Sequence, residues 1–455
     1  MKIIDILNII NGELIIGNEN LECKNFSKDT RNIKKGDIYI GLKGNKFDGS
    51  KFWKQALDNG AEAVIVENIE ISQKEIEQYK NKTIIKVKST LNALYKIAKY
   101  KRSLYDIPVI AVTGSVGKTS TKDIIASVVS QRYKTLKTEG NNNNNIGLPL
   151  TILKLEDHQA LVIEMGMNHL GEISLLTDIA KPTLAIITNI GTSHIGNLGS
   201  RENILKAKTE ILEGMEIPKV IINNDNDLLH KWYEENKENI EIHTFGIENK
   251  SDFIAKNIKL QEDRSEIKVI AQGEEISIKV PVGGKHFVYN ALCAVQVGKL
   301  LGIANDEIQK AIYQFKLTEK RMDIKKLENG AILINDAYNS SYESIKASLE
   351  FLEVYKEKRK IAILGDIFEL GKYSETLHRK IGMEVARSNI NVLICSGENS
   401  KYIVEEVKQN PKIKTYFMHN NEKIVENLHE IISKDDVILV KASNGMKFFE
   451  ICQKL

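Results

Sequence analysis

The segment PVIAVTGSVGKTS, residues 108–120, restricts the fold of this chain more than any other. An apolar strand candidate runs into a glycine-rich turn, and a helical segment follows directly. Backbone N–H groups of such a turn can cradle phosphate oxygens at the start of a helix. Lys118 can then reach the β- and γ-phosphates of a nucleotide, while the Thr119 hydroxyl ligates Mg²⁺. Only two residues separate Gly114 from Gly117, so the loop is shorter than the common G-x-x-x-x-G-K-[ST] pattern. We predict a nucleotide-binding loop here rather than a plain Gly-Lys turn.

Apolar strand candidates alternate with helical segments along most of the chain, which predicts an α/β fold with mostly parallel sheets. We expect a small α/β domain at 1–105, a central P-loop-type domain at 106–315 and a doubly wound, Rossmann-like domain at 316–455. The last domain lacks a G-x-G-x-x-G fingerprint, so no dinucleotide is inferred there. The main strand candidates are GDIYIGL (36–42), AEAVIVE (61–67), KTIIKV (82–87), ALVIEMG (160–166), LAIITNIG (184–191), KVIINNDN (219–226), AILINDAY (331–338), KIAILGD (360–366), NVLICSG (391–397), IKTYFM (413–418) and VILVKAS (437–443).

Polar side chains follow two of the central strand candidates. Glu164 ends one of them and His194 lies just beyond the next. Open α/β sheets bind ligands at the carboxyl ends of their strands, so Glu164 suits a Mg²⁺ ligand better than a solvated glutamate. A lone histidine is more often structural, but its position makes a ligand role for His194 an equal alternative. Lys206 and Lys208 are two residues apart on a helical segment, so at most one of them faces the site.

Composition restricts the cellular setting and the kinds of partner. The 64 basic and 61 acidic residues leave a net charge of +3, which argues against nucleic-acid binding. The four cysteines are scattered without C-x-x-C spacing, which favours a reducing cytoplasm over disulfides or a zinc site. Neither a signal peptide nor a transmembrane segment is predicted. We expect a cytoplasmic protein without membrane insertion.

Several segments together resemble the Mur ligases, the ATP-dependent amide-bond-forming enzymes of peptidoglycan synthesis. The resemblance is strongest to the branch that joins D-alanyl-D-alanine to a UDP-N-acetylmuramoyl-tripeptide, and it covers nearly the whole chain. It implies a first domain for the UDP-sugar, a second for ATP and a third for the amino substrate, in a protein that we expect to be a monomer. The matching segments are TGSVGKTS, EGNNNNNIGLPLT, VIEMGMNHLGEI, TNIGTSHIGNLGSRENILKAKTEI, DTRNIKKGDIYIGLKGNKFDGSKF (29–52), GKHFVYNALCAV (284–295), KRMD (320–323), INDAYNS (334–340) and LGDIFELG (364–371).

The resemblance also implies roles for individual residues. Those expected to bind ATP are Gly114, Ser115, Gly117, Lys118, Thr119, Ser120, His286, Asn290, Arg321 and Asp336. Thr119 and Glu164 would hold one Mg²⁺, and His194 with a carbamylated Lys208 would hold a second. Lys118, Glu164, His194 and Lys208 are the expected catalytic residues. Addition of CO₂ to a neutral lysine amine makes an anionic oxygen ligand, which a hard cation prefers to an amine.

The same resemblance places the two substrates. Residues expected to bind them are Asp29, Thr30, Arg31 and Asp48 for the uridine nucleotide, Asn144 and Asn145 in the wall of the site, and Asn339 and Ser340 near the dipeptide. The asparagine run 141–145 is then a polar loop of the site rather than a flexible spacer. One departure stands out, because the family usually has a proline shortly after INDAYN and this chain continues Ser340, Ser341, Tyr342.

The implied reaction activates a carboxylate. The tripeptide carboxylate attacks the γ-phosphate of ATP, and the dipeptide amine then displaces phosphate from the acyl phosphate. The sequence does not indicate which amino acid is the third residue of the tripeptide.

Four competing functions are weighed against this one. The sister ligase that adds a diamino acid is the nearest, but its D-N-P-R motif is missing from the last domain. A folylpolyglutamate synthase would not explain the uridine-binding segment. A nucleotide-dependent switch or ATPase would release phosphate without the two substrates. A non-catalytic binding protein would not need Lys118, Thr119, Glu164, His194 and Lys208, which are all present.

Overall fold

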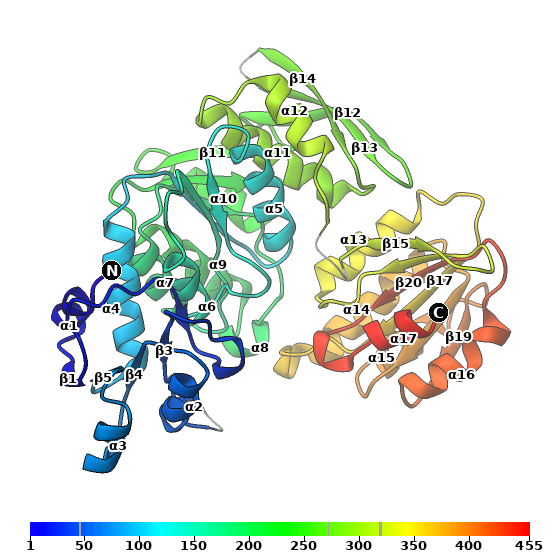
Figure 1. The fold of residues 1–455 in the computed structure, drawn as a ribbon. Coiled ribbons are helices and arrows are strands. Elements are labelled where there is room, and N and C mark those ends of the chain that lie inside the picture. The colour runs from blue at the N-terminus through cyan, green and yellow to red at the C-terminus, as the bar shows by residue number, and fades with distance from the viewer. Residues whose placement is uncertain (45–46, 272, 318–320) are drawn as a thin grey trace.

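The computed structural model describes residues 1–44, 47–271, 273–317 and 321–455, and within them the chain forms three sheets covered by helices (Figure 1). The N-terminal and central domains lie together, and the C-terminal domain forms a separate lobe. The sheets are mainly parallel, so the predicted α/β fold class is confirmed. The domain limits at 105 and 315 stay a prediction.

The N-terminal sheet has the order β1-β5-β4-β3-β2. Its strands are β1 (Glu13–Ile16), β2 (Phe26–Ser27), β3 (Ile38–Ile40), β4 (Ala63–Val66) and β5 (Thr83–Lys86). Strand β1 pairs antiparallel with β5, and the other described pairs are parallel. Its helical segments are α1 (Ile3–Ile10), η1 (Thr30–Asn32), η2 (Gly49–Phe52), α2 (Trp53–Asp58), α3 (Gln73–Gln78) and α4 (Thr90–Ser103).

The central sheet has the order β14-β13-β12-β11-β10-β9-β6-β8-β7. It is parallel from β7 to β12 and ends in the antiparallel strands β13 and β14. Its strands are β6 (Val109–Thr113), β7 (Thr135–Lys137), β8 (Ala160–Glu164), β9 (Leu184–Ile187), β10 (Lys219–Asn223), β11 (Glu241–Gly246), β12 (Phe253–Leu260), β13 (Ser265–Ala271) and β14 (Glu274–Val280). Its helical segments are α5 (Lys118–Val129), α6 (Gly147–Ile152), α7 (Glu172–Ala180), α8 (Ile195–Leu198), α9 (Arg201–Thr209), η3 (Glu210–Leu212), α10 (Asp227–Asn236), α11 (Lys285–Leu300) and α12 (Asn305–Tyr313).

The C-terminal sheet has the order β15-β16-β20-β17-β18-β19, and β15 at its edge is antiparallel to β16. Its strands are β15 (Asp323–Lys326), β16 (Ile332–Asn335), β17 (Lys360–Gly365), β18 (Val392–Ser396), β19 (Lys414–Phe417) and β20 (Val437–Lys441). Its helical segments are α13 (Tyr342–Leu352), η4 (Gly371–Tyr373), α14 (Ser374–Arg387), α15 (Lys401–Val407), α16 (Asn421–Ile431), η5 (Asn444–Met446) and α17 (Phe449–Lys454).

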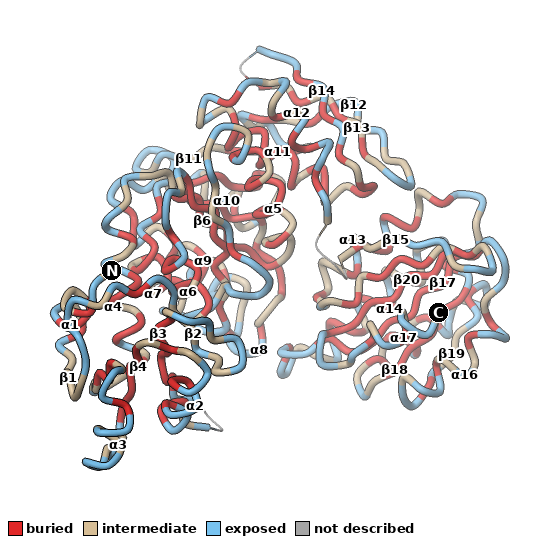
Figure 2. The backbone as a smooth tube through the Cα atoms, in the orientation of Figure 1, coloured by how far each residue is buried: buried red, intermediate tan, exposed pale blue. Residues whose placement is uncertain are grey.

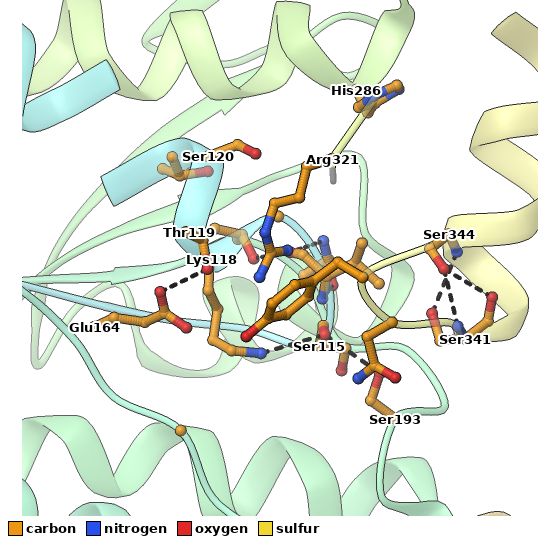
Figure 3. Close-up of a pocket in the computed structure, with 18 of the residues that line it drawn as sticks. Ser115, Lys118, Thr119, Ser120, Glu164, Ser193, His286, Arg321, Ser341 and Ser344 are labelled. Carbon is orange, nitrogen blue, oxygen red and sulfur yellow. Dashed lines mark hydrogen bonds between the residues drawn. The ribbon is translucent and has the colours of Figure 1, made fainter. Parts of the chain in front are cut away.

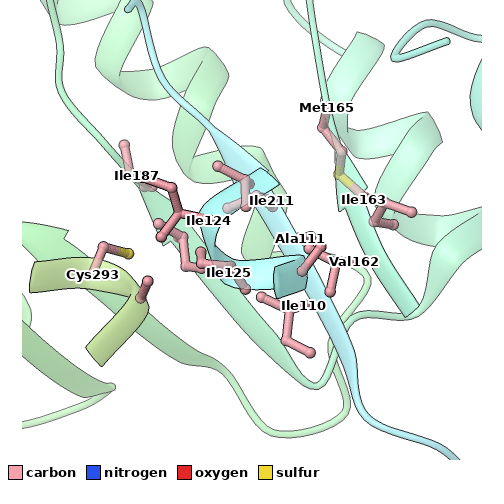
Figure 4. Packing of buried hydrophobic residues seen from close by; sticks show 14 of the residues in the cluster. Ile110, Ala111, Ile124, Ile125, Val162, Ile163, Met165, Ile187, Ile211 and Cys293 are labelled. Carbon is pink, nitrogen blue, oxygen red and sulfur yellow. The ribbon is translucent and has the colours of Figure 1, made fainter. Parts of the chain in front are cut away.

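Continuous apolar strands explain why the parallel sheets are covered on both faces. In Figure 2 the buried segments run through the strands of each domain. In the central domain α5 packs on β6, β7 and β8 and against α11, which packs on β11 to β14 of the same sheet. Figure 4 shows Ile124 and Ile125 of α5 in this core, with Ala111 of β6 and Cys293 of α11. This packing fixes the helix that begins at the phosphate loop.

A cavity in this core should destabilise the protein. We expect Ile125→Ala to lower the free energy of unfolding by about 2–5 kcal/mol, because Ile125 is fully buried and its removed atoms leave a void. Urea denaturation followed by circular dichroism measures the change. Ile217→Ala is the matched control, since Ile217 is 73% exposed and should change stability by less than about 0.5 kcal/mol. Equal effects of the two variants would contradict the packing of α5.

Candidate active site between the central and C-terminal domains

Two glycines shape the loop between β6 and α5. Gly114 has φ +149° and lies so close to Thr188 that any side chain would collide with the Thr188 hydroxyl. Gly117 has φ +83° and occupies the N-cap of α5, a backbone conformation that favours glycine. Asn189, just after β9, fixes the loop by accepting hydrogen bonds from Ser115 N at 3.0 Å and Val116 N at 2.9 Å. The short loop is thus an ordered turn with helix N–H groups at its end.

A carboxylate from the neighbouring strand completes the loop (Figure 3). The Thr119 hydroxyl donates to Glu164 Oε2 at 2.7 Å, and Asn143 Nδ2 donates to Glu164 Oε1 at 2.7 Å. Lys118 Nζ donates to Gly114 O at 2.8 Å. Burial lowers the pKa of Lys118, and the nearby Glu164 opposes that shift. Hydroxyl and carboxylate oxygens are ligands that Mg²⁺ prefers, so Thr119 and Glu164 fit the expected metal.

The five asparagines form an ordered loop with separate tasks. Asn143 binds Glu164, and its backbone carbonyl accepts a hydrogen bond from Gly166 N at 2.9 Å. Asn144 Oδ1 accepts from Gly147 N at 2.8 Å, which holds the start of α6. Asn145 instead donates to the Tyr95 hydroxyl at 3.0 Å. The run is therefore part of the folded structure, and Asn143 connects it to the phosphate loop.

His194 and Lys208 differ in their surroundings. His194 is the N-cap of α8 with φ +64°, and its Nδ1 lies 2.5 Å from Glu369 Oε2 of the C-terminal domain. Lys208 on α9 is 2% exposed, whereas Lys206 is exposed, in agreement with their two-residue spacing. Within the described part of the chain, Lys208 Nζ has no hydrogen-bond or ion-pair partner. Burial, with a smaller contribution from Lys118, lowers the pKa of Lys208 far below its usual value.

The C-terminal domain forms the opposite wall of the site. Asp336 accepts hydrogen bonds from Lys441 Nζ at 2.5 Å and from Ser348 Oγ at 2.9 Å. The guanidinium of Arg321 lies 4.0 Å from the centre of the Tyr338 ring. The Arg321 Nε atom is buried and lacks a hydrogen-bond partner among the described residues. Such an unpaired donor fits a site that binds an anionic ligand.

His286 and Asn290 extend from α11 toward the same site. Burial lowers the pKa of His286 to about 4, an effect that Asp336 opposes and Lys441 reinforces. Asn290 Oδ1 accepts a hydrogen bond from the Thr121 hydroxyl at 2.9 Å, which links α11 to α5. Helix α11 therefore contacts both the phosphate-loop helix α5 and α13 of the opposite wall.

One cavity of about 440 Å³ brings many of the expected residues together. Among those in its lining are Ser115, Gly117, Lys118, Thr119, Ser120, Asn144, Glu164, His194, His286, Asn290, Arg321, Asp336, Asn339 and Ser340. Gly114, Asn145 and Lys208 lie outside that lining. The central and C-terminal domains therefore enclose the site jointly.

The expected uridine-binding residues form a separate group in the N-terminal domain. Asp29 accepts from Arg31 N at 3.0 Å and begins η1, which contains Thr30, and Asp48 accepts from Ser50 N at 3.0 Å and begins η2. Burial raises the pKa of Tyr39 to about 12, and the negative charges of Asp29 and Asp48 add smaller contributions in the same direction. Both carboxylates therefore act on one hydroxyl. Asn45 and Lys46 of the matching segment lie outside the described residues, as does Lys320 of KRMD.

The missing proline after INDAYN has a local replacement. Ser341 is the N-cap of α13, and its hydroxyl accepts from Ser344 N at 3.2 Å while Ser344 Oγ accepts from Ser341 N at 2.9 Å. This capping box begins the helix without a proline. The Ser340 hydroxyl beside it is buried and has no partner in the described part of the chain.

Sequence reasoning overlooked Lys441, Glu369 and Tyr338 as residues of the site. Lys441 is the final residue of the apolar strand β20, a position at the ligand-binding edge that could have identified it. Glu369 belongs to the matching segment LGDIFELG, but the sequence does not indicate which of its side chains faces the central domain.

Two kinds of feature are missing from the described residues. They contain no group of three or more histidine, cysteine, aspartate or glutamate side chains arranged to hold a metal ion. No described helix is both long and apolar enough to span a membrane.

The fold and the site define a nucleotide-dependent α/β enzyme whose phosphate loop faces a second domain. Family models match the chain as Mur ligase family, catalytic domain (23–102), Mur ligase middle domain (112–298) and Mur ligase, glutamate ligase domain (320–444). The chain belongs to the Mur ligase family, a family of ATP-dependent ligases.

The chain is also similar to individual ligases of this family in sequence and in structure. The chain is 37% identical to the UDP-N-acetylmuramoyl-tripeptide–D-alanyl-D-alanine ligase of Bacillus subtilis, over 94% of this chain and 92% of the relative. It is 29% identical to the Escherichia coli enzyme of the same name, over 98% of this chain and 96% of the relative. A crystal structure of MurF from Acinetobacter baumannii has a TM-score of 0.90 at 27% identity, covering 100% of this chain and 98% of that one. MurF ligase from Thermotoga maritima in complex with ADP has a TM-score of 0.83 at 27% identity, covering 96% and 98%.

The environment of His286 predicts how that side chain titrates. With a pKa of about 4, His286 stays neutral between about pH 5.5 and 8, and nuclear magnetic resonance should show no titration of its ring protons there. The His286→Gln variant assigns the signal. In the unfolded chain the same histidine takes up a proton near pH 6.5. The contribution of His286 to the free energy of unfolding is therefore fully present above that pH and is lost as the pH falls toward 4. A midpoint near pH 6.5 in the folded protein would contradict the described burial.

Proposed function

We propose that this protein joins D-alanyl-D-alanine to a UDP-N-acetylmuramoyl-tripeptide at the expense of ATP, in the cytoplasmic synthesis of peptidoglycan precursors. The observation that carries this proposal is the cavity in which Lys118 and Thr119 of the central domain face Arg321 and Asp336 of the C-terminal domain. The names of the relatives and the similarity along nearly the whole chain support the choice of substrates.

The phosphate loop would hold the nucleotide. N–H groups at the start of α5 would donate to the phosphates, and Lys118 would exchange its bond with the Gly114 carbonyl for phosphate oxygens. Arg321, whose Nε has no hydrogen-bond partner among the described residues, would add a second positive charge from the opposite domain. The carboxylate of Asp336 faces the same cavity and would contact the ribose, while Asn290 lies near the base.

Two Mg²⁺ ions would complete the site. Thr119 and Glu164 would hold the first, and His194 together with a carbamate on Lys208 would hold the second. The buried amine of Lys208, without a partner among the described residues, has a lowered pKa, which favours the neutral form that can add CO₂. When bound, the cations offset the negative charge that gathers on the transferred phosphoryl group.

The proposed chemistry proceeds in two steps. A tripeptide carboxylate oxygen attacks the γ-phosphorus of ATP, and the bond between that phosphorus and the β-phosphate oxygen breaks. ADP departs, and the peptide carboxylate has become an acyl phosphate. The dipeptide amine attacks the acyl carbon, loses a proton, and expels phosphate as the amide forms. Lys118 and Arg321 stabilise the charge in the first step, and closure of the two walls of the cavity excludes water from the acyl phosphate. The acceptor dipeptide would bind beside Asn339 and Ser340.

The test is phosphate release by the purified protein with ATP and Mg²⁺. We expect release only when the UDP-muramoyl-tripeptide and D-alanyl-D-alanine are both present, with kcat reduced by about 10²-fold or more in Lys118→Ala, because a phosphoryl contact is lost. Release that ignores the dipeptide would make the protein an ATPase. Release that requires a dipeptide precursor and a free diamino acid would make it the sister ligase.

The carbamate predicts a specific spectroscopic signal. In ¹³C-labelled bicarbonate the native protein should show a carbamate carbon resonance, and Lys208→Met should lose both this resonance and ligase activity. Lys206→Met, a variant of the exposed neighbour on the same helix, should retain both. An unchanged resonance in Lys208→Met would place the modification elsewhere, and full activity of that variant would remove Lys208 from the site.

A further inference from the structure

Residues 191–199 of the central domain, here called the docking segment, contact the C-terminal domain through both backbone and side-chain groups. Gly196 N donates to the Glu369 carbonyl at 3.0 Å. A Cβ atom on Gly196 would lie 2.5 Å from Glu369 O and 2.7 Å from Gly371 N, so glycine allows the two backbones to touch. In Figure 1 the docking segment lies around α8, on the side of the central domain that faces the C-terminal lobe.

Two further contacts hold the ends of the docking segment. At its start, a Cβ on Gly191 would lie 2.5 Å from Glu343 Cδ, and the Thr192 hydroxyl donates to Glu343 Oε2 at 3.0 Å. At its end, the Tyr373 hydroxyl donates to the Gly199 carbonyl. Each glycine of the segment thus contacts the opposite domain, from two separate places in that domain's sequence.

His194 lies in the middle of this segment, opposite the Glu369 carboxylate. Its buried Nδ1 is 2.5 Å from Glu369 Oε2, a charged-pair contact, and forms no hydrogen bond within the described residues. Both residues have φ +64°, a left-handed conformation that costs energy for residues other than glycine. Such strain persists only where surrounding contacts hold it and is concentrated at functional sites.

A carboxylate beside one ring nitrogen of a histidine decides what the other ring nitrogen can do. A carboxylate at Nδ1 favours the proton on Nδ1 and holds the ring in place. The Nε2 atom is then unprotonated, and its lone pair can bind a cation. The partner that fixes His194 belongs to the other domain. The ring is therefore held only when the C-terminal domain is docked on the docking segment.

We propose that Glu369 is a positioning residue for His194, and that docking of the C-terminal domain through the docking segment completes the cation site. This inference rests on the proposed role of His194 as a cation ligand. It adds that the ligand is set by an interdomain carboxylate, so a nucleotide can bind the central domain before the second cation is held.

The first test measures cation binding by Glu369→Gln, which keeps the size of the side chain and removes its charge. Electron paramagnetic resonance of Mn²⁺, titrated in the presence of ADP, should show affinity lowered by about 10–100-fold. The affinity for ADP, measured by calorimetry, should stay within about twofold, because the phosphate loop is untouched. Asn197→Ala, an exposed position on the same helix, is the control and should change neither affinity. Unchanged or tighter Mn²⁺ binding by Glu369→Gln would overturn the proposal.

The second test separates docking from charge. Ala is well tolerated in a helix, but in Gly196→Ala its methyl group meets the backbone of residues 369–371 and should prevent docking. Small-angle X-ray scattering with ADP should show a larger radius of gyration than wild type, at an unchanged melting temperature. Its Mn²⁺ affinity should fall as in Glu369→Gln. A compact Gly196→Ala variant, or one with wild-type Mn²⁺ affinity, would contradict the inference.

The same measurements distinguish failure of the positioning role from failure of the proposed function. If the wild-type protein does not ligate the two substrates but gives the expected Mn²⁺ and scattering results, the proposed function is rejected and the positioning role stands. Ligation by the wild type combined with unchanged Mn²⁺ affinity in Glu369→Gln would reject only the positioning role.

Discussion

The order of three neighbouring strands, β9-β6-β8, determines the rest of the site. Because β6 lies between the other two, the loop that follows it must emerge between the residues that follow β8 and β9. Glu164 therefore meets Thr119 on one side, and Asn189 meets the loop backbone on the other. Gly114 allows the approach on the β9 side. The phosphate loop, the candidate metal ligands and the docking segment all occupy their places because of this order.

Charge explains why the cavity is suited to an anionic ligand. The positive charge of Lys118 lowers the pKa of the buried Lys208. In the same way, Arg321 of the opposite domain lowers the pKa of Lys118. Glu164 is the carboxylate that acts on Lys118 from within the central domain. Removing a charge from water is costly unless an opposite charge accompanies it. Nucleotide phosphates would supply that opposite charge, and a carbamate would replace the buried amine of Lys208 with an anion.

Much of the fold and part of the site could be predicted from the sequence. Apolar strand candidates alternating with helical segments predicted the α/β class, and the spacing of Lys206 and Lys208 predicted that they differ in exposure. Patterns along the chain could not place Glu369 opposite His194, because that contact depends on how two domains pack. They also missed Lys441, whose importance follows from its 2.5 Å contact with Asp336 across the C-terminal sheet. The asparagines of the run 141–145 are chemically identical, and only the folded loop distinguishes their partners.

The fate of one oxygen atom tests the central claim most directly. A UDP-muramoyl-tripeptide labelled with ¹⁸O in its terminal carboxylate is incubated with the protein, ATP, Mg²⁺ and D-alanyl-D-alanine, and the released phosphate is analysed by mass spectrometry. If the cavity activates that carboxylate as an acyl phosphate, each phosphate should contain one labelled oxygen from the peptide. Phosphate that contains only unlabelled oxygen would show that water attacks ATP instead, and would contradict the assignment of this site to amide-bond formation.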